Sequence, residues 1–271
     1  MCPHCRAFIT SDDKVCPYCD AKVGARAIDL RVPDAVAGGL LPADRFVSML
    51  LLMVNTAIYV ATVVISNRAG NSSSLMGIDP RTLIEFGANY PTYVSAGQWW
   101  RLITAGYLHI SLFHIGMNMW ALYDLGGQVE EVFGAGRMTA IWTVSTVTGF
   151  WSSYYFGRSF SAGASAGLFG LIGAMIALGV LHKTSAFAQA AKAVYLRMAV
   201  YGLAIGFLGL FPMDNWAHLG GLAGGFGISM LAGIENKDGG MKDRLWNWLA
   251  IVALGVTVLA FARLIAFSFL R

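Results

Sequence analysis

Long apolar runs alternate with short polar segments over most of the chain, and this pattern predicts a bundle of membrane-spanning helices. A run of roughly 18 or more apolar residues is long enough to cross the hydrocarbon core of a bilayer as a helix. Several such runs follow one another, and we expect seven helices from them. The predicted helices cover residues 46–66, 111–128, 138–155, 164–181, 193–211, 216–234 and 246–267.

The polar segments between these runs contain turn and linker signals. Pro33, Gly38, Gly39 and Pro42 interrupt any helix before the first apolar run, so this stretch is predicted to be a linker. The long segment after the first helix ends at Trp99-Trp100-Arg101, an aromatic and cationic group suited to a membrane interface. The predicted domains are a small module at 1–23, a linker at 24–45, a six-helix core at 46–234, and a loop with the seventh helix at 235–271.

Composition supports a membrane protein. Only 13% of the residues are charged and 56% are hydrophobic, whereas soluble domains carry about 25% charged residues. We therefore predict an all-α polytopic membrane protein surrounded by membrane lipid. The formal net charge of +4 is modest, and no nucleic-acid partner is expected.

The distribution of Lys and Arg predicts the orientation, because loops rich in these residues stay in the cytosol. If the N-terminus is cytosolic, thirteen of the 19 Lys and Arg residues lie on the cytosolic side and five on the outer side. We therefore expect a cytosolic N-terminus and an outer C-terminus, in a plasma membrane of the bacterial type.

All four cysteines lie near the start of the chain, in Cys2-Pro3-His4-Cys5 and Cys16-Pro17-Tyr18-Cys19. Two such pairs at short separation can hold one tetrahedral Zn²⁺, which replaces the core that a short module cannot build. The residues between them, Thr10 to Lys14, are expected to form the turn between two short strands, as in a zinc ribbon. The alternatives are two disulfides or redox-active pairs, and His4 is expected to be a bystander. A cytosolic partner could dock on this module.

Polar groups from three predicted helices meet on one side of the membrane. The second, fourth and sixth helices all enter from the outer face, with His114, Ser165 and His218 near their starts. Ser165 and His218 lie about two residues past their helix starts, which places them at similar depth, given a rise of about 1.5 Å per residue. Ionisable residues inside a membrane are costly and indicate a functional site.

Small residues would let the fourth and sixth helices pack backbone to backbone, which brings the Ser165 hydroxyl within reach of the His218 imidazole. A serine becomes nucleophilic when an adjacent base takes its proton. His114 and Asn118 are four residues apart on one helix face and can donate to an oxyanion. Asp214 is too close in sequence to His218 to be assumed a third catalytic member, so we expect a dyad. The small residues are Gly163, Gly167, Gly170 and Gly173 at the fourth helix, and Ala217, Gly221 and Gly225 in the sixth helix.

Other interpretations of these residues are open. The Gly163-x-x-x-Gly167 motif alone is more often a packing motif than a catalytic one. Gly163-x-Ser165-x-Gly167 also matches the nucleophile turn of soluble hydrolases, but that turn needs a preceding strand, and here the flank is a membrane span. A transporter would use polar helix positions as a pathway, yet the fourth and sixth helices are nearly uncharged beyond their outer ends.

The motifs from Trp100 to Gly225 resemble those of the rhomboid intramembrane serine proteases. Phe169 lies where some members of that family have a tyrosine that packs on the catalytic histidine. The seventh helix resembles the "six plus one" arrangement of part of the family, whereas the cysteine module lies outside the resemblance. The motifs are Trp100-Arg101, His114-x-x-x-Asn118, Gly126 to Gly134 with a Gly-x-x-x-Glu turn, Gly163-Ala164-Ser165-Ala166-Gly167, and Ala217-His218-Leu219-Gly220-Gly221.

This resemblance implies a fold and an activity. The expected fold is a six-helix core plus a seventh helix, preceded by a zinc ribbon. The implied activity is hydrolysis of peptide bonds in or beside transmembrane segments of protein substrates, without a cofactor for catalysis. Ser165 would be the nucleophile and His218 the general base, with His114 and Asn118 in the oxyanion region. The alternative is an inactive relative that binds or escorts membrane proteins, which would be expected to lack Ser165 or His218.

Overall fold

The computed structural model describes residues 5, 15–21, 35–36, 41–42, 45–157, 160–209, 211–234 and 240–268. The chain divides into two compact units, Met1–Ala43 and Asp44–Arg271. Each unit is considered by itself.

The first unit contains a cysteine cluster and a short antiparallel ladder. Cys5 and Cys16 lie side by side, and Cys19 is close to both. Strand β1 (Ala35–Val36) pairs with β2 (Leu41–Pro42) in the segment predicted to be a linker. The predicted turn at Thr10 to Lys14 and the residue Cys2 lie outside the described residues.

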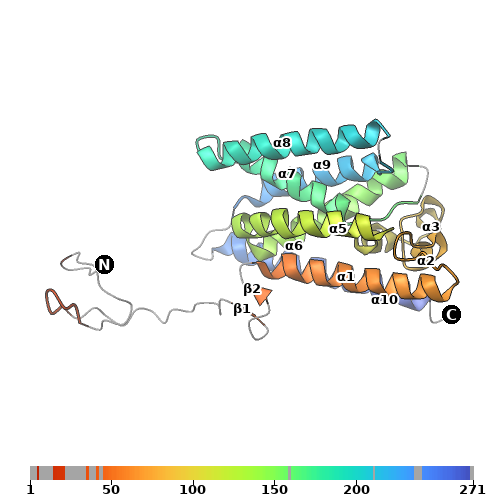
Figure 1. The fold of residues 1–271 in the computed structure, drawn as a ribbon. Coiled ribbons are helices and arrows are strands. Elements are labelled where there is room, and N and C mark those ends of the chain that lie inside the picture. Colours follow the sequence, from red (N-terminus) through yellow and green to blue (C-terminus); the bar gives the residue numbers. More distant parts are fainter. Residues whose placement is uncertain are drawn as a thin grey trace. The chain divides into compact units, whose positions relative to one another are not determined.

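The second unit is helical, which confirms the predicted fold class (Figure 1). Three of its helices are long and apolar enough to cross a membrane, namely α1, α8 and α10, and the shorter α7 is also apolar. The predicted number of seven spans stays a prediction. The helices are α1 (Phe46–Arg68), α2 (Pro80–Glu85), α3 (Pro91–Ser95), α4 (Arg101–Thr104), η2 (Ala105–Tyr107), α5 (Leu112–Ala121), η3 (Leu122–Gly126), α6 (Gly127–Phe156), α7 (Ser165–Leu181), α8 (Ala186–Phe207), α9 (Asn215–Ala232) and α10 (Met241–Ser268).

The second and third predicted helices are separated at a single residue, Gly134. α5, η3 and the first part of α6 follow one another without a gap, and α6 is interrupted at Gly134, where φ is +80° and ψ +160°. Glycine adopts such a positive φ without steric cost. The helical stretch therefore continues to Gly134, past the predicted end of the second helix near residue 128.

Glu130 can lie inside the bundle because its carboxylate has partners. It accepts hydrogen bonds from the Val47 and Ser48 backbone N–H groups, at 2.8 and 2.9 Å, and from the Ser48 hydroxyl at 2.7 Å. These N–H groups belong to the first turn of α1, where no intrahelical acceptor is available and a negative charge is favoured. Glu130 thereby ties the start of α1 to α6.

The segment 69–111 between α1 and α5, called the loop lobe below, is organised around Arg101. Its guanidinium donates to the Ile84 and Ala88 carbonyls, at 2.7 and 2.9 Å, and to Gln98 Oε1 at 2.7 Å. The Arg101 side chain also lies over the Tyr93 ring. Burial lowers the pKa of Arg101 to about 10, so the group stays charged at neutral pH. Arg101 thus holds the lobe together from inside instead of reaching the membrane interface.

Helix α10 packs along the lobe and α6. The rings of Trp100 and Phe267 lie 5.5 Å apart between centroids, and those of Tyr107 and Phe261 lie 5.4 Å apart, edge to face. Leu264, between these two phenylalanines, is 3% exposed. The last turns of α10 are therefore attached to the loop lobe.

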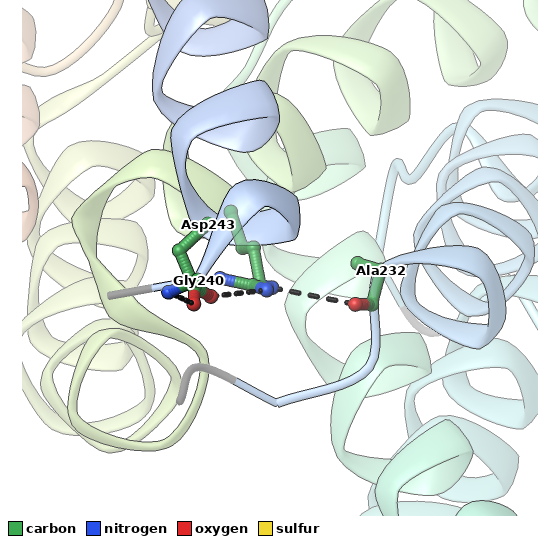
Figure 2. Close-up of polar contacts among 4 residues, drawn as sticks. Ala232, Gly240 and Asp243 are labelled. Carbon is green, nitrogen blue, oxygen red and sulfur yellow. Dashed lines mark hydrogen bonds and ion pairs between the residues drawn. The ribbon is translucent and has the colours of Figure 1, made fainter. Parts of the chain in front are cut away.

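The other end of α10 is held by a buried ion pair (Figure 2). Arg137 Nη2 of α6 donates to Asp243 Oδ1 at 2.7 Å, and Arg137 Nε donates to the Ala232 carbonyl at the end of α9. Asp243 Oδ2 accepts from the Gly240 N–H at 2.9 Å, before α10 begins. The pair explains why α10 starts earlier than the predicted residue 246, because Asp243 is satisfied inside the protein.

We predict that Arg137→Met lowers the stability of the bundle by about 3–5 kcal/mol, because removing one partner of a buried ion pair leaves the other charge uncompensated. The measurement is thermal unfolding of the purified protein in detergent. Arg244→Met is the control, since Arg244 lies exposed on the first turn of α10, next to Asp243 in the sequence. The double variant Arg137→Met/Asp243→Leu should recover much of the loss. Equal melting of Arg137→Met and Arg244→Met would contradict the proposed contribution.

Candidate active site

Helix α7 lies in the interior of the bundle and begins at Ser165 (Figure 1). It packs against α6, α8 and α9. Thirteen of its 17 residues are buried, so nearly all of its surface faces protein, as expected for a helix that is apolar all round. A serine at its first residue is therefore held in a fixed place.

Helices α7 and α9 approach each other to backbone contact at two glycines of α9. A Cβ added to Gly221 would lie 2.1 Å from the Ala166 carbonyl oxygen, and one added to Gly225 would lie 2.1 Å from the Gly170 carbonyl oxygen. These distances leave no room for a side chain. The approach brings residues near the start of both helices close together, as the spacing of small residues predicts.

Ser165 and His218 meet at this junction. Ser165 Oγ lies 2.9 Å from His218 Nε2, within hydrogen-bond distance. His218 is 3% exposed, whereas Ser165 is half-buried. The start of α9 is set by Asp214, whose carboxylate accepts from the Ala217 N–H at 3.0 Å as a helix cap. The arrangement can transfer the serine proton to the imidazole as the hydroxyl attacks an electrophile.

The ring of Phe169 holds the imidazole in this orientation. The Phe169 and His218 rings are stacked, with centroids 4.2 Å apart and planes 8° from parallel. On α8, a Cβ added to Gly202 would lie 2.8 Å from Phe169 Cζ. Gly202 therefore makes the space that Phe169 needs, a role that its position in the sequence alone does not reveal.

His114 points its outer ring nitrogen at the same small space as Ser165. A Cβ added to Gly163 would lie 3.0 Å from His114 Nε2 and 3.5 Å from Ser165 Oγ. The Ile110 backbone N–H lies 3.4 Å from His114 Nδ1, which accepts from it. Because Nδ1 accepts, the proton of a neutral His114 ring is on Nε2, which can donate to a group placed beside Ser165. Gly163 leaves this space free.

The side chains of Asn118 and Asp214 have hydrogen-bond partners outside the Ser165–His218 pair. Asn118 Nδ2 donates to the His114 carbonyl at 2.8 Å, one turn back on α5. Asp214 caps α9 and accepts from the Ser153 hydroxyl. Within the described part of the chain, His218 Nδ1 is buried without a hydrogen-bond partner. No described carboxylate therefore accepts a hydrogen bond from Nδ1 of this histidine.

Two features near the site were not assigned a role by sequence reasoning. His109 is fully buried, and its ring lies 5.1 Å from that of His114, edge to face, so it packs against the proposed donor. The Gly163 N–H donates to the Ala105 carbonyl at 3.0 Å, which ties the loop lobe to the residues before α7. The role of His109 could have been suspected from the sequence, because it lies five residues before His114. The contact between Gly163 and Ala105 leaves no signal in the sequence.

The described cysteines form a cluster that fits a metal. The Sγ atoms of Cys5, Cys16 and Cys19 all lie within 4.8 Å of one another, and Cys5 Sγ is 3.6 Å from Cys16 Sγ. Thiolates bound to one tetrahedral Zn²⁺ lie about 3.8 Å apart, given Zn–S bonds of about 2.3 Å, whereas a disulfide is about 2.0 Å long. The cluster is therefore compatible with a zinc-ribbon-like module.

The fold and the site together define a helical membrane protein with a serine–histidine pair inside the bundle. The chain belongs to the rhomboid family, because the Rhomboid domain model matches residues 96–234. This range includes the serine, both histidines of the site and Asn118. The resemblance in the sequence motifs is thus confirmed at the level of the family.

Several characterised members of the family are similar to this chain. "Rhomboid protease GluP" of Bacillus subtilis is 34% identical over 175 residues, which are 65% of this chain and 34% of that protein. "RHOMBOID-like protein 7" of Arabidopsis thaliana is 34% identical over 162 residues, 59% of this chain and 51% of the other. "Rhomboid-like protease 1" of Toxoplasma gondii is 31% identical over 182 residues, 64% of this chain and 60% of the other. The chain therefore spans less than two thirds of the length of each of these relatives.

We predict that Gly221→Ala weakens the contact between α7 and α9 and lowers stability by about 1–3 kcal/mol, because the added methyl group meets the Ala166 carbonyl. The same change should slow labelling of Ser165 by a fluorophosphonate, which reports on the serine–histidine geometry. Gly227→Ala on the same helix is the control, since a Cβ there meets nothing within 4 Å. If both variants label and melt alike, close packing of these helices does not hold the pair.

Proposed function

We propose that this protein is an intramembrane serine endopeptidase that uses a Ser165–His218 dyad. The observation that carries the proposal is the 2.9 Å contact between Ser165 Oγ and His218 Nε2 inside a rhomboid bundle. An isolated histidine or serine in a membrane helix has structural explanations. A serine and a base held in hydrogen-bond contact at a buried helix start provide the minimum set for nucleophilic catalysis.

The proposed reaction proceeds in two steps. Ser165 Oγ attacks the scissile carbonyl carbon while His218 Nε2 takes the hydroxyl proton, and the resulting tetrahedral intermediate breaks its C–N bond. His218 gives the proton to the leaving amine, which leaves an ester between Ser165 and the acyl part of the substrate. Water then attacks this ester with His218 again as the base, and Ser165 is regenerated.

The oxyanion of the tetrahedral intermediate needs donors beside Ser165. His114 supports this role, because its Nε2 proton faces the space at Gly163 next to Ser165 Oγ. The start of α7 adds backbone N–H groups, since the first N–H groups of a helix have no intrahelical acceptor. Asn118 is proposed to assist with the second N–H of its amide, while the first holds the His114 carbonyl.

The proposed substrates are transmembrane proteins, cleaved in or beside a membrane segment that must unwind to expose its backbone. In this proposal the N-terminus is cytosolic and the site opens to the outer side of a bacterial-type membrane, as the Lys and Arg distribution favours. The proposed domains are those predicted from the sequence, a module at 1–23, a linker at 24–45, the core at 46–234 and the last helix at 235–271.

A structural Zn²⁺ is proposed for the first unit, held by Cys5, Cys16 and Cys19 with Cys2 as the fourth ligand. The support is the three sulfur atoms that lie within 4.8 Å of one another. The metal would stabilise a module too short to have its own hydrophobic core. It would take no part in peptide hydrolysis.

We predict that the wild-type protein in liposomes cleaves a reconstituted transmembrane substrate and that Ser165→Ala abolishes cleavage, since no other group replaces the nucleophile. His218→Ala should lower the rate by about a thousandfold or more, because the serine loses its base. Cleavage is measured by mass spectrometry of the products, and fluorophosphonate labelling gives a readout that is independent of substrate choice.

Ser153→Ala serves as the control, because this hydroxyl contacts Asp214 and lies outside the dyad. Cleavage that persists in Ser165→Ala would refute the proposed nucleophile. Co-purification of the substrate without cleavage or labelling of the wild-type protein would favour a relative that only binds membrane proteins.

We further predict about one Zn²⁺ per chain in the purified protein, measured by inductively coupled plasma mass spectrometry. Cys16→Ser should remove most of the zinc, because three thiolates hold the ion more weakly than four. His4→Ala should keep it, since His4 is not among the proposed ligands. Zinc-free protein whose four cysteines are joined in disulfides would rule out the metal site.

A further inference from the structure

A cavity of about 270 Å³ lies between the loop lobe and the end of α10, away from Ser165. The lobe contributes Ala96, Gly97, Gln98 and Trp100, and α10 contributes Arg263, Ala266 and Phe267. The three α10 residues are spaced three and four apart, so they lie on one side of that helix. The cavity therefore lies where the last helix meets the lobe, and nothing in the proposed catalytic mechanism uses it.

Three of the lining side chains, those of Gln98, Trp100 and Arg263, carry N–H groups. Arg263 is exposed, and none of the seven lining residues is acidic. Within the described ranges, the one ion pair between side chains is Arg137 with Asp243, and Arg263 has no carboxylate partner. An arginine in the last turns of an apolar helix without a partner is available to an anion from outside the protein.

Gln98 is oriented as a second donor. It is 6% exposed, and its Oε1 accepts from Arg101 Nε at 2.7 Å. With the amide oxygen bound to Arg101, the Nε2 group of Gln98 keeps its two N–H donors, for which the described residues show no acceptor. The hydrogen bond from Arg101 thus turns the amide oxygen of Gln98 toward Arg101 and the amide nitrogen away from it.

Trp100 gives the cavity an apolar wall. Its side chain is 8% exposed, and its Nε1 is buried without a hydrogen-bond partner among the described residues. Its ring packs on Phe267 across the cavity wall, with centroids 5.5 Å apart. A cavity with Arg263 and Gln98 as donors and an aromatic wall matches a ligand that has an anionic group joined to an apolar part.

We expect lipid around this part of the protein, because α10 is long and apolar enough to cross a membrane. On α10, the side chains of Leu259 and Ile265 are each 49% exposed, on either side of Arg263 in the sequence. Exposed apolar side chains of α10 are in contact with acyl chains when the helix is in a bilayer. Basic pockets between membrane helices bind phospholipid head groups, and arginine pairs with phosphate through two parallel hydrogen bonds.

We propose that this cavity binds the phosphate of a membrane phospholipid, with Arg263 and Gln98 as the donors and the acyl chains along α10. The bound lipid bridges the loop lobe and α10. It complements the ring contacts that already join them. This site goes beyond the proposed protease activity and does not depend on it.

The test is native mass spectrometry of the delipidated full-length protein in detergent, titrated with dioctanoyl phosphatidylglycerol. We expect binding that Arg263→Gln weakens by about tenfold, as for the loss of one charge-assisted pair. Arg263→Lys should weaken it less, because the charge stays. Arg81→Gln is the matched control, since Arg81 is an exposed arginine of the same lobe outside the cavity.

Two further ligands identify the chemistry that is recognised. Dioctanoylglycerol has the acyl chains without the phosphate, and we expect it to bind much more weakly than the phospholipid. Inorganic phosphate alone should leave the thermal unfolding temperature unchanged at millimolar concentration. Equal affinity of wild type and Arg263→Gln, equal binding of dioctanoylglycerol, or an Arg263-dependent stabilisation by phosphate alone would each overturn the proposal.

Discussion

Backbone contact between α7 and α9 is the constraint on which the candidate site depends. In lipid, helices gain little by hiding apolar side chains from each other, so close packing and hydrogen bonds must hold them together. Gly221 and Gly225 leave the carbonyl oxygens of α7 directly against α9. At that separation, a serine at the start of α7 and a histidine on the first turn of α9 are in hydrogen-bond contact. A larger residue at either glycine would meet a carbonyl oxygen of α7 and force the two helices apart.

The loop lobe and α10 support this arrangement from the side. Arg101 holds the lobe together, and the Ala105 carbonyl anchors the Gly163 N–H immediately before α7. Helix α10 packs its aromatic side chains on the same lobe. A segment that contains none of the proposed catalytic groups thus anchors the residues immediately before Ser165, in addition to the helices that pack around α7.

The sequence predicted the helical fold class, the family and the polar groups of the site, because each left a strong local signal. Apolar runs identify the helices, and polar residues inside such runs stand out. The errors arose where long-range partners act. The sequence did not predict that Glu130 accepts hydrogen bonds from Val47 and Ser48, because this role cannot be read from neighbouring residues. Arg101 was assigned to the membrane interface, whereas carbonyls from the same lobe bury it. The space that Gly202 gives to Phe169 likewise depends on the packing of two separate helices.

The buried pair of Arg137 and Asp243 can form only late in biosynthesis. Arg137 belongs to α6 and Asp243 to α10, so the ribosome makes the cation about a hundred residues before its partner. An uncompensated guanidinium is costly in a low-dielectric interior. We therefore expect water to solvate this corner of the bundle until the last helix inserts and supplies the carboxylate. A chain that lacks α10 would leave the Arg137 guanidinium without its charged partner.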